Sequence, residues 1–240
     1  MMIFDKIIKD EDEVKSIVKE SLNKNSNLLL TYFNQHCFNI YFSDKSYRNL
    51  IDSHFLCYLD GIGIYLALKL FGYKNVRKFN ASDLNDIIFS DLIMRKIKVF
   101  IIGGTFSEEL INKITRENGL IICGYQSGYF NETETYELID KINKSKAQVI
   151  MIGMGVPKQE ILVFKISNSV NVNLILCVGN FLEFYFGTKK RIPDRFSNSG
   201  LEWIYRLLSE PGRLWKRYII GIPLFVLRIA KLYLQRGIDA

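Results

Sequence analysis

The sequence predicts an α/β fold with a mostly parallel sheet that is covered by helices on both faces. Short apolar runs alternate with segments of helical periodicity along the first 188 residues, an order typical of doubly wound domains. The apolar runs are continuous, which indicates strands that are buried on both faces. The excess of basic residues lies entirely after residue 188. This distribution predicts a separate helical appendage at the C-terminal end.

Six strands and seven intervening helices are expected from this pattern. The strands are predicted at 28–33, 54–59, 98–103, 120–125, 147–153 and 174–179. The helices are predicted at 9–22, 43–52, 61–71, 82–95, 106–118, 132–145 and 157–168. A polar, basic and turn-rich stretch at 186–198 follows the last strand. We therefore place one globular domain over residues 1–188 and the appendage over residues 189–240.

The appendage carries the whole net charge of the chain. The 240 residues have a formal net charge of +7, and residues 189–240 alone hold 11 Lys and Arg against 4 Asp and Glu. Such asymmetry favours a polyanionic partner: nucleic acid, an anionic membrane or phosphate groups. Arginines alternate there with the aromatic residues Trp203, Tyr205, Trp215 and Tyr218. This pattern fits either a helical hairpin packed on the domain or an element in the headgroup zone of a membrane.

Several kinds of site are not expected. The four cysteines are scattered without a C-x-x-C pair, which favours reduced core residues. His36 and His54 are the only histidines, too few for a usual zinc site. The D-E-D run at 10–12 lies on the first predicted helix, so we interpret it as an exposed helix face and not as a metal site. The longest apolar run, Ile219–Leu227, contains a proline and is about half the length that a membrane-spanning helix needs.

Polar residues and glycines follow nearly every predicted strand. In open α/β sheets, ligands bind beyond the carboxyl ends of the strands. Glycines at these ends allow backbone N–H groups and helix N-termini to approach phosphate. The candidate binding residues on this rule are Thr31, Asn34, Asp60, Gly103, Gly104, Thr105, Tyr125, Gly128, Gly155, Lys158, Gln159, Glu160 and Asn180.

Two of these motifs allow a structural as well as a functional interpretation. Asp60 in D-G-I-G is either the N-cap of a helix or a general base, and its chemistry alone does not separate the two. G-G-T-F-S-E-E at 103–109 is either a helix start capped by Ser107 or a phosphate-binding turn. It matches neither the dinucleotide-binding fingerprint nor the P-loop, so NAD and ATP are weakly supported.

The order of the motifs resembles that of the WecG/TagA/CpsF family of bacterial glycosyltransferases. The resemblance covers nearly the whole chain and rests on T-x-x-N (31–34), D-G-I-G (60–63), G-G before a helix (103–117), G-Y-Q-S-G-Y-F (124–130), G-M-G-V-P-K-Q-E (153–160), V-G-N-F-L-E-F-Y-F-G-T-K-K-R-I-P (178–193) and G-L-E-W-I-Y-R-L-L-S-E-P-G-R-L-W-K-R-Y (200–218).

This resemblance implies a Rossmann-like fold and an inverting, metal-independent transferase. Such an enzyme moves a sugar, typically N-acetylmannosamine, from UDP to a sugar on undecaprenyl diphosphate, for cell-wall, capsule or exopolysaccharide synthesis. The appendage would close the active site at the cytoplasmic face of the membrane, where the protein would bind peripherally. No cofactor and no nucleic acid are implied, and a homo-oligomer is compatible with the resemblance.

The resemblance also assigns roles to single residues. It implies that Asp60 is the catalytic base and that Thr31, Asn34 and Gln159 are catalytic. Among the appendage cations, it implies that Arg206, Arg213 and either Lys216 or Arg217 bind substrate. The other implied substrate-binding residues, beyond the strand-end candidates, are Lys78 and Arg191.

The sequence departs from the family pattern at three places. The first motif has one residue more between Thr31 and Asn34 than the common T-x-N form, Lys78 with the adjacent Arg77 stands where an arginine is usual, and Glu183 replaces an aspartate. These changes leave the donor open between N-acetylmannosamine, glucose and another hexose. Two functions of other classes also stay open: a non-catalytic UDP-sugar-binding protein, and a nucleic-acid-binding protein, which the neutral domain disfavours.

Overall fold

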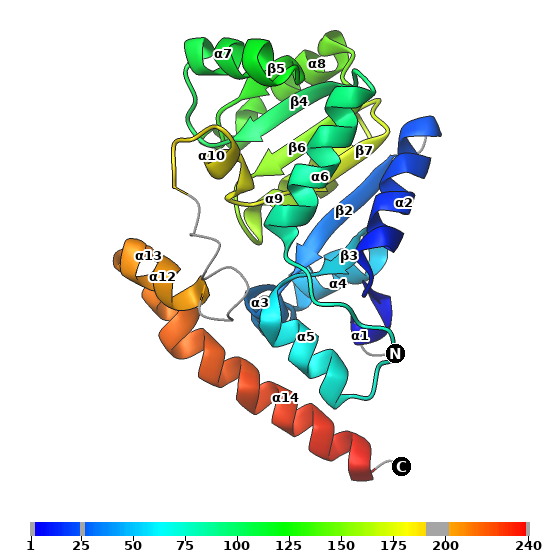
Figure 1. Cartoon of the computed structure of the whole chain (residues 1–240), viewed down its shortest axis with the longest axis vertical. Helices are drawn as coiled ribbons and strands as arrows, with labels where there is room; N and C mark the ends of the chain where they lie inside the picture. The colour runs from blue at the N-terminus through cyan, green and yellow to red at the C-terminus, as the bar shows by residue number, and fades with distance from the viewer. Residues whose placement is uncertain (1–2, 25–26, 191–201, 239–240) are drawn as a thin grey trace.

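The computed structural model describes the chain except for residues 1–2, 25–26, 191–201 and 239–240. Seven strands form one parallel sheet in the order β1-β3-β2-β7-β6-β4-β5 (Figure 1), which confirms the predicted α/β class. The strands are β1 (Ile7–Ile8), β2 (Leu28–Phe33), β3 (Leu56–Leu59), β4 (Lys98–Gly103), β5 (Ile121–Gln126), β6 (Val149–Gly153) and β7 (Leu174–Cys177).

Helices cover both faces of this sheet. α2 contacts α6 on one face, and α4 contacts α9 on the other (Figure 1). The helices of the first 190 residues are α1 (Ile3–Lys6), α2 (Glu11–Asn23), α3 (Gln35–Ser43), α4 (Lys45–His54), α5 (Gly61–Leu70), α6 (Ala81–Met94), α7 (Glu108–Asn118), the 3-10 turn η1 (Glu132–Glu134), α8 (Thr135–Ser145), α9 (Lys158–Ser167) and α10 (Phe181–Tyr185).

The central strands are apolar because both of their faces are buried. All four residues of β7 are buried, and in β6 only the terminal Gly153 is partly exposed. Several helices start at a side-chain cap, as the sequence suggests for polar residues after strands. Asp10, Asp44 and Asn80 each accept two backbone N–H bonds at the start of α2, α4 and α6 respectively.

Glycines bring the loops at the carboxyl edge of the sheet close together. A Cβ atom at Gly103 would lie 2.5 Å from the carbonyl oxygen of Gly153, and one at Gly153 would lie 2.5 Å from that of Gly179. Real Cβ atoms do not tolerate such distances, so these positions require glycine. The ends of β4, β6 and β7 therefore form one tight platform.

Four elements were not predicted from the sequence: β1, α1, α3 and α10. β1 has only two residues, which carry no periodic signal; it pairs with β3 through Ile7 and Cys57. α1 and α10 are also short, with four and five residues, and α3 starts directly after β2 at its cap Asn34. The predicted strands and helices are present, with boundaries that coincide or shift by up to three residues.

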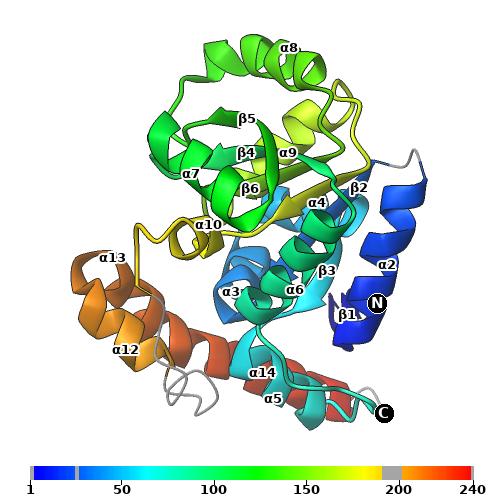
Figure 2. The ribbon, with the colours of Figure 1, turned by 45° about the horizontal axis from the view of Figure 1, so that its top comes forward.

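The C-terminal segment is helical. It consists of α12 (Glu202–Ser209) and then one long helix formed by α13 (Pro211–Trp215), the π-helical turn η2 (Lys216–Ile220) and α14 (Gly221–Ile238) (Figure 1). α14 packs on α3 and runs beside α5 (Figures 1 and 2). The division of the chain at residue 188 stays a prediction.

The expectation that no segment is long enough to span a bilayer was wrong by length and composition. The helix Pro211–Arg236 has 26 residues and is apolar enough to cross a membrane on these two criteria, and 17% of its apolar window is buried. The sequence prediction considered only the apolar run Ile219–Leu227 with its proline. In the structure Pro223 lies just after the π-helical turn η2, and the helix continues through it.

Candidate functional site

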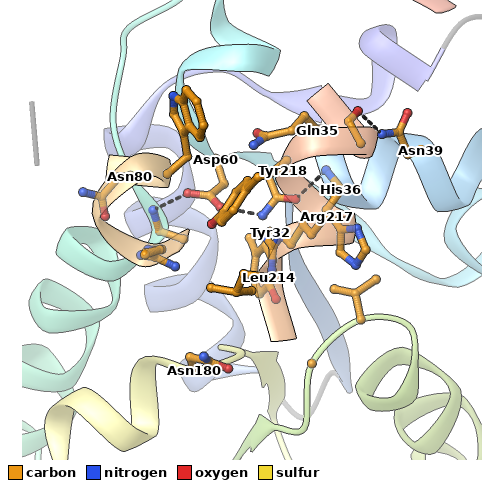
Figure 3. A pocket seen from close by; sticks show the side chains of 18 of the residues that line it. Tyr32, Gln35, His36, Asn39, Asp60, Asn80, Asn180, Leu214, Arg217 and Tyr218 are labelled. Carbon is orange, nitrogen blue, oxygen red and sulfur yellow. Dashed lines mark hydrogen bonds between the residues drawn. The ribbon is translucent and has the colours of Figure 1, made fainter. Parts of the chain in front are cut away.

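A cavity of about 800 Å³ lies over the carboxyl ends of four neighbouring strands (Figure 3). Its floor comes from the loops after β2, β3, β6 and β7, which contribute Asn34, Asp60, Gly155 and Asn180. The opposite wall comes from α12, α13, η2 and α14. The cavity therefore lies between the sheet and the C-terminal helices, where the strand-end rule places a ligand.

Asp60 is held in one orientation within this cavity. Its Oδ2 accepts a hydrogen bond from Asn34 Nδ2 (3.0 Å), and its Oδ1 accepts one from the backbone N–H of Ala81 (3.0 Å). Asp60 makes no side-chain bond to its own helix α5. Asp60 therefore occupies the N-cap position of α5 without capping it through its side chain, and the carboxylate joins the start of α6 to the end of β2.

The orientation of the Asn34 amide follows from the backbone. Its Oδ1 caps α3 by accepting from the N–H groups of His36 (3.0 Å) and Cys37 (3.2 Å). The amide nitrogen must then point the other way, toward Asp60. The cap of one helix thus directs a donor at the carboxylate of the next loop.

The cavity favours anions. The helices α3, α5, α6 and α9 begin at its lining, and their N-termini carry partial positive charge. The lining includes the carboxylates Glu11, Asp60, Asp83 and Glu210, against a larger set of cations: Lys78, Lys158, Arg206, Arg213, Lys216, Arg217 and Arg228. Within the described part of the chain, no group of three or more His, Cys, Asp or Glu side chains could hold a metal ion.

Two of the arginines have unused donors. The Nε atoms of Arg206 and Arg217 are buried and have no hydrogen-bond partner among the described residues. A buried donor without a partner costs free energy, so both guanidinium groups are suited to bind an anionic ligand. Arg217 lies in the π-helical turn η2, a type of turn that is frequent at functional sites.

Arg213 is engaged differently. Its Nε and Nη2 donate to the two carboxylate oxygens of Glu210 (2.7 and 3.0 Å), which lowers the pKa of the Glu210 carboxyl. Glu210 also pairs with Lys189 (3.3 Å), and Lys189 pairs with Glu183 (2.8 Å). Arg213 therefore belongs to an ion-pair network that joins α10 to the C-terminal helices.

The sequence reasoning underestimated His36. Its side chain lies in the cavity near Arg217 (Figure 3). Burial and, to a smaller extent, the Arg217 charge lower the pKa of His36 to about 4. The imidazole is therefore neutral at physiological pH and can exchange hydrogen bonds with a sugar or phosphate. Its position two residues after the cap Asn34 is the signal that could have identified it.

Comparison with known proteins identifies relatives of this chain. A sequence profile described as "Glycosyl transferase WecG/TagA/CpsF family" matches residues 4–238. The chain belongs to this family. A relative from Bacillus spizizenii is 30% identical over 175 residues, which is 72% of this chain and 66% of the relative. That protein is named N-acetylglucosaminyldiphosphoundecaprenol N-acetyl-beta-D-mannosaminyltransferase.

Three of the WecG/TagA/CpsF motif residues lie outside the cavity lining. Thr31, Gln159 and Glu160 are fully buried. The Thr31 hydroxyl and Gln159 Nε2 both donate to Glu160 Oε1 (2.8 Å each), and the backbone N–H of Gly179 donates to Gln159 Oε1 (3.2 Å). Burial raises the pKa of the Glu160 carboxyl. This cluster supports the loop that carries Asn180 and does not itself border the cavity.

The side chain that faces the cavity from β2 is Tyr32. Successive residues of a strand point to opposite faces, so Thr31 points to Glu160 while Tyr32 and Asn34 line the cavity (Figure 3). Sequence reasoning missed Tyr32 because it followed the threonine of the family motif. Counting two residues back from Asn34 along the strand would have identified it.

The remaining family positions fall into two groups. Lys78, Gly155, Lys158 and Asn180 line the cavity. Of the two adjacent basic residues, Lys78 is the one at the cavity, since Arg77 pairs with Asp10 (3.3 Å) and Asp12 (3.4 Å). These pairs, with the helix cap of Asp10, place Asp10 and Asp12 at the start of α2 and outside the cavity lining.

The second group lies at the same sheet edge but outside the lining: Gly103, Gly104, Thr105, Tyr125 and Gly128. Gly104 O accepts from the Tyr125 hydroxyl (3.3 Å) and from the backbone N–H of Gly128 (3.3 Å), so this loop cluster bonds to itself. Arg191 lies outside the residues that the structure describes.

The aromatic residues of the C-terminal segment do not all face outward. Trp203 lines the cavity, and its ring is 6.1 Å from the buried ring of Tyr218. Trp215 alone of the four aromatic residues noted in the sequence is exposed. Two of the four aromatic residues, Trp203 and Tyr218, therefore border the cavity.

We predict that Glu160→Gln removes part of the pH dependence of stability. A carboxyl group whose pKa is raised by folding stabilises the native state below about pH 4, and this contribution is lost as pH rises toward the raised pKa. Between pH 5 and 8, the free energy of unfolding should fall less in the variant than in the wild type. Denaturant titrations at several pH values measure this.

The matched control is Glu109→Gln, at an exposed position in the first turn of α7. Its stability profile should run parallel to that of the wild type. Parallel profiles for Glu160→Gln as well would contradict a raised pKa of the Glu160 carboxyl.

Proposed function

We propose that this protein transfers a sugar from a UDP-sugar to a hydroxyl group of a sugar on polyprenyl diphosphate, with inversion and without a metal ion. Membership of the family and the activity in the name of the Bacillus relative support this proposal. The observation that carries it is the oriented Asp60 carboxylate, which lies in a cavity lined by an excess of cationic side chains.

In the proposed reaction, Asp60 accepts the proton of the acceptor hydroxyl while the hydroxyl oxygen attacks the anomeric carbon of the donor. The new glycosidic bond forms as the bond between the anomeric carbon and the UDP oxygen breaks, and the electron pair leaves with UDP. Displacement in a single step inverts the anomeric centre. Asn34 and the Ala81 N–H hold the carboxylate in position, which reduces the cost of orienting the base.

The negative charge of the departing UDP requires compensation. Arg206 and Arg217 have unpaired buried donors at the cavity, and arginine can bind diphosphate oxygens in a bidentate manner. The four helix N-termini add fixed positive ends. Such preorganised groups stabilise the charge in the transition state, which is the role that a divalent ion has in other transferases.

The donor is best represented by UDP-N-acetylmannosamine, because the relative is named as an N-acetylmannosaminyltransferase. UDP-glucose or another UDP-hexose is the alternative that the sequence departures leave open. A screen of UDP release with these donors, and with a diphosphate-linked N-acetylglucosamine acceptor on a polyprenyl chain, tests the proposal directly.

We also propose peripheral binding to the cytoplasmic face of the membrane. The long C-terminal helix exposes apolar side chains along its length. From Gly221 to Arg236 it contains basic but no acidic residues, and basic side chains near an anionic surface contribute about 1 kcal/mol each. This surface would place the cavity next to the lipid acceptor.

We predict that Asp60→Asn lowers kcat by about 10²–10⁴-fold, the usual contribution of a general base. The amide has the same shape but cannot accept the proton, so donor binding should change little. UDP release and calorimetric donor titration measure the two quantities. A folded variant with near-normal kcat would show that Asp60 has only a structural role.

We predict that chelation leaves activity intact. The expected turnover with EDTA equals that without it, because arginines and helix N-termini compensate the diphosphate charge. The measurement is UDP release before and after dialysis against EDTA. Loss of activity that Mn²⁺ or Mg²⁺ restores would contradict the metal-independent mechanism.

We predict that Leu227→Gln/Leu234→Gln weakens sedimentation with anionic liposomes about tenfold or more, because two apolar side chains no longer enter the lipid. Both leucines are 67% exposed and seven residues apart, on one face of α14. The control is Tyr129→Gln/Tyr136→Gln, two exposed aromatic residues far from α14 in the sequence. Equal binding of both variants would argue against a membrane role for the helix.

A further inference from the structure

The cavity is longer than the sugar site requires. Besides the residues around Asp60, its lining includes Ile40 and Ser43 near the end of α3 and Leu224 and Arg228 on α14. Arg217 and Arg228 are eleven residues apart, so the cavity follows the helix for about 16 Å. An arm of the cavity therefore runs along the α3–α14 contact, away from the catalytic carboxylate.

This arm has a fixed floor. Asn39 Nδ2 donates to Gly221 O (2.7 Å), and Arg228 Nη1 donates to Asn39 O (2.6 Å) and Oδ1 (3.1 Å). The Phe38 and Phe225 rings pack edge to face, 5.2 Å apart, between the same two helices. α3 and α14 are thus joined by bonds that do not depend on a ligand, and the groove above them is preformed.

Three apolar side chains line the groove beside the polar residues Asn39, Ser43 and Arg228. Ile220 and Leu224 line the cavity although they are 51% and 37% exposed, and Ile40 faces them from α3. Exposed apolar side chains that continue a polar, cationic cavity match a ligand with a charged head and a hydrocarbon tail. The undecaprenyl diphosphate in the name of the Bacillus relative's acceptor is a molecule of this kind.

We propose that the polyprenyl chain of the acceptor leaves the active site along the α3–α14 groove, in contact with Ile40, Ile220 and Leu224. This assignment rests on the proposed function. The diphosphate would then lie near Arg217, at the start of the groove, and the first isoprene units would follow α14. The cap that orients Asp60 and the groove belong to the same helix α3, so a chain held there would position the acceptor sugar relative to the base.

The other side of α14 supplies a matched control. Ile219 and Val226 are each 56% exposed and lie roughly 100° to 160° around the helix from Ile220 and Leu224, at about 100° per residue. Tyr233, seven residues after Val226, packs its ring on Phe71 beyond the end of α5 (5.8 Å). This side of the helix therefore faces α5 and not the groove.

The experiment compares two acceptors with the same N-acetylglucosamine diphosphate head, one on a minimal prenyl chain and one on a long polyprenyl chain. The assay is UDP release in non-ionic detergent micelles, where no bilayer is present. Ile220→Gln/Leu224→Gln is compared with Ile219→Gln/Val226→Gln. All four residues are substantially exposed and glutamine has good helix propensity, so both variants should fold, which circular dichroism verifies.

In the groove variant, the ratio of KM for the long chain to KM for the short chain should rise about tenfold, because two apolar contacts with the chain are lost. The control variant should keep the wild-type ratio. A wild-type ratio in the groove variant would overturn the groove assignment. An equal increase of the ratio in both variants would also overturn it, because it would indicate nonspecific contact of the helix with the micelle. If the wild type releases no UDP with any acceptor, the proposed function itself fails together with this inference.

Discussion

The arrangement of the site depends on the carboxamide of Asn34. Its oxygen caps α3, and this leaves its nitrogen to bind Asp60, whose second oxygen accepts from the start of α6. One side chain thereby couples the end of β2, the end of β3 and two helix N-termini. Because the buried strands hold both loops at the same sheet edge, the carboxylate stays near the helix termini.

The same helix connects the site to the C-terminal segment. Asn34 caps α3, and one turn later Phe38 and Asn39 of the same helix contact α14. α3 therefore fixes both the position of the long helix over the cavity and the position of Asp60. The π-helical turn before α14 then directs Arg217 into the cavity and buries Tyr218 against Trp203. The proposed binding of lipid and nucleotide through different segments requires such a rigid connection.

Much of the site could be predicted from strand ends and motif order. Asp60, Asn34, Lys78, Gly155, Lys158 and Asn180 line one cavity, as expected for residues that follow parallel strands. Strand ends and motif order could not predict the direction of each side chain or its ion-pair partner. Thr31 and Gln159 face the interior and hold Glu160, whereas Tyr32 and His36 face the cavity. Arg213 pairs with Glu210, whereas Arg206 and Arg217 keep unpaired donors.

The sequence by itself determined the fold class, the edge of the sheet that carries the site, the uneven charge and the family. These properties depend on local periodicity and on residue order, because the strand and helix repeats are set by the backbone. Only the tertiary structure decided which side chains meet. Thr31 and Glu160 are 129 residues apart in sequence, and Asn39 and Gly221 are 182 apart. Such pairs are selected by packing and by the need to satisfy buried polar groups, and neither requirement leaves a periodic signal along the chain.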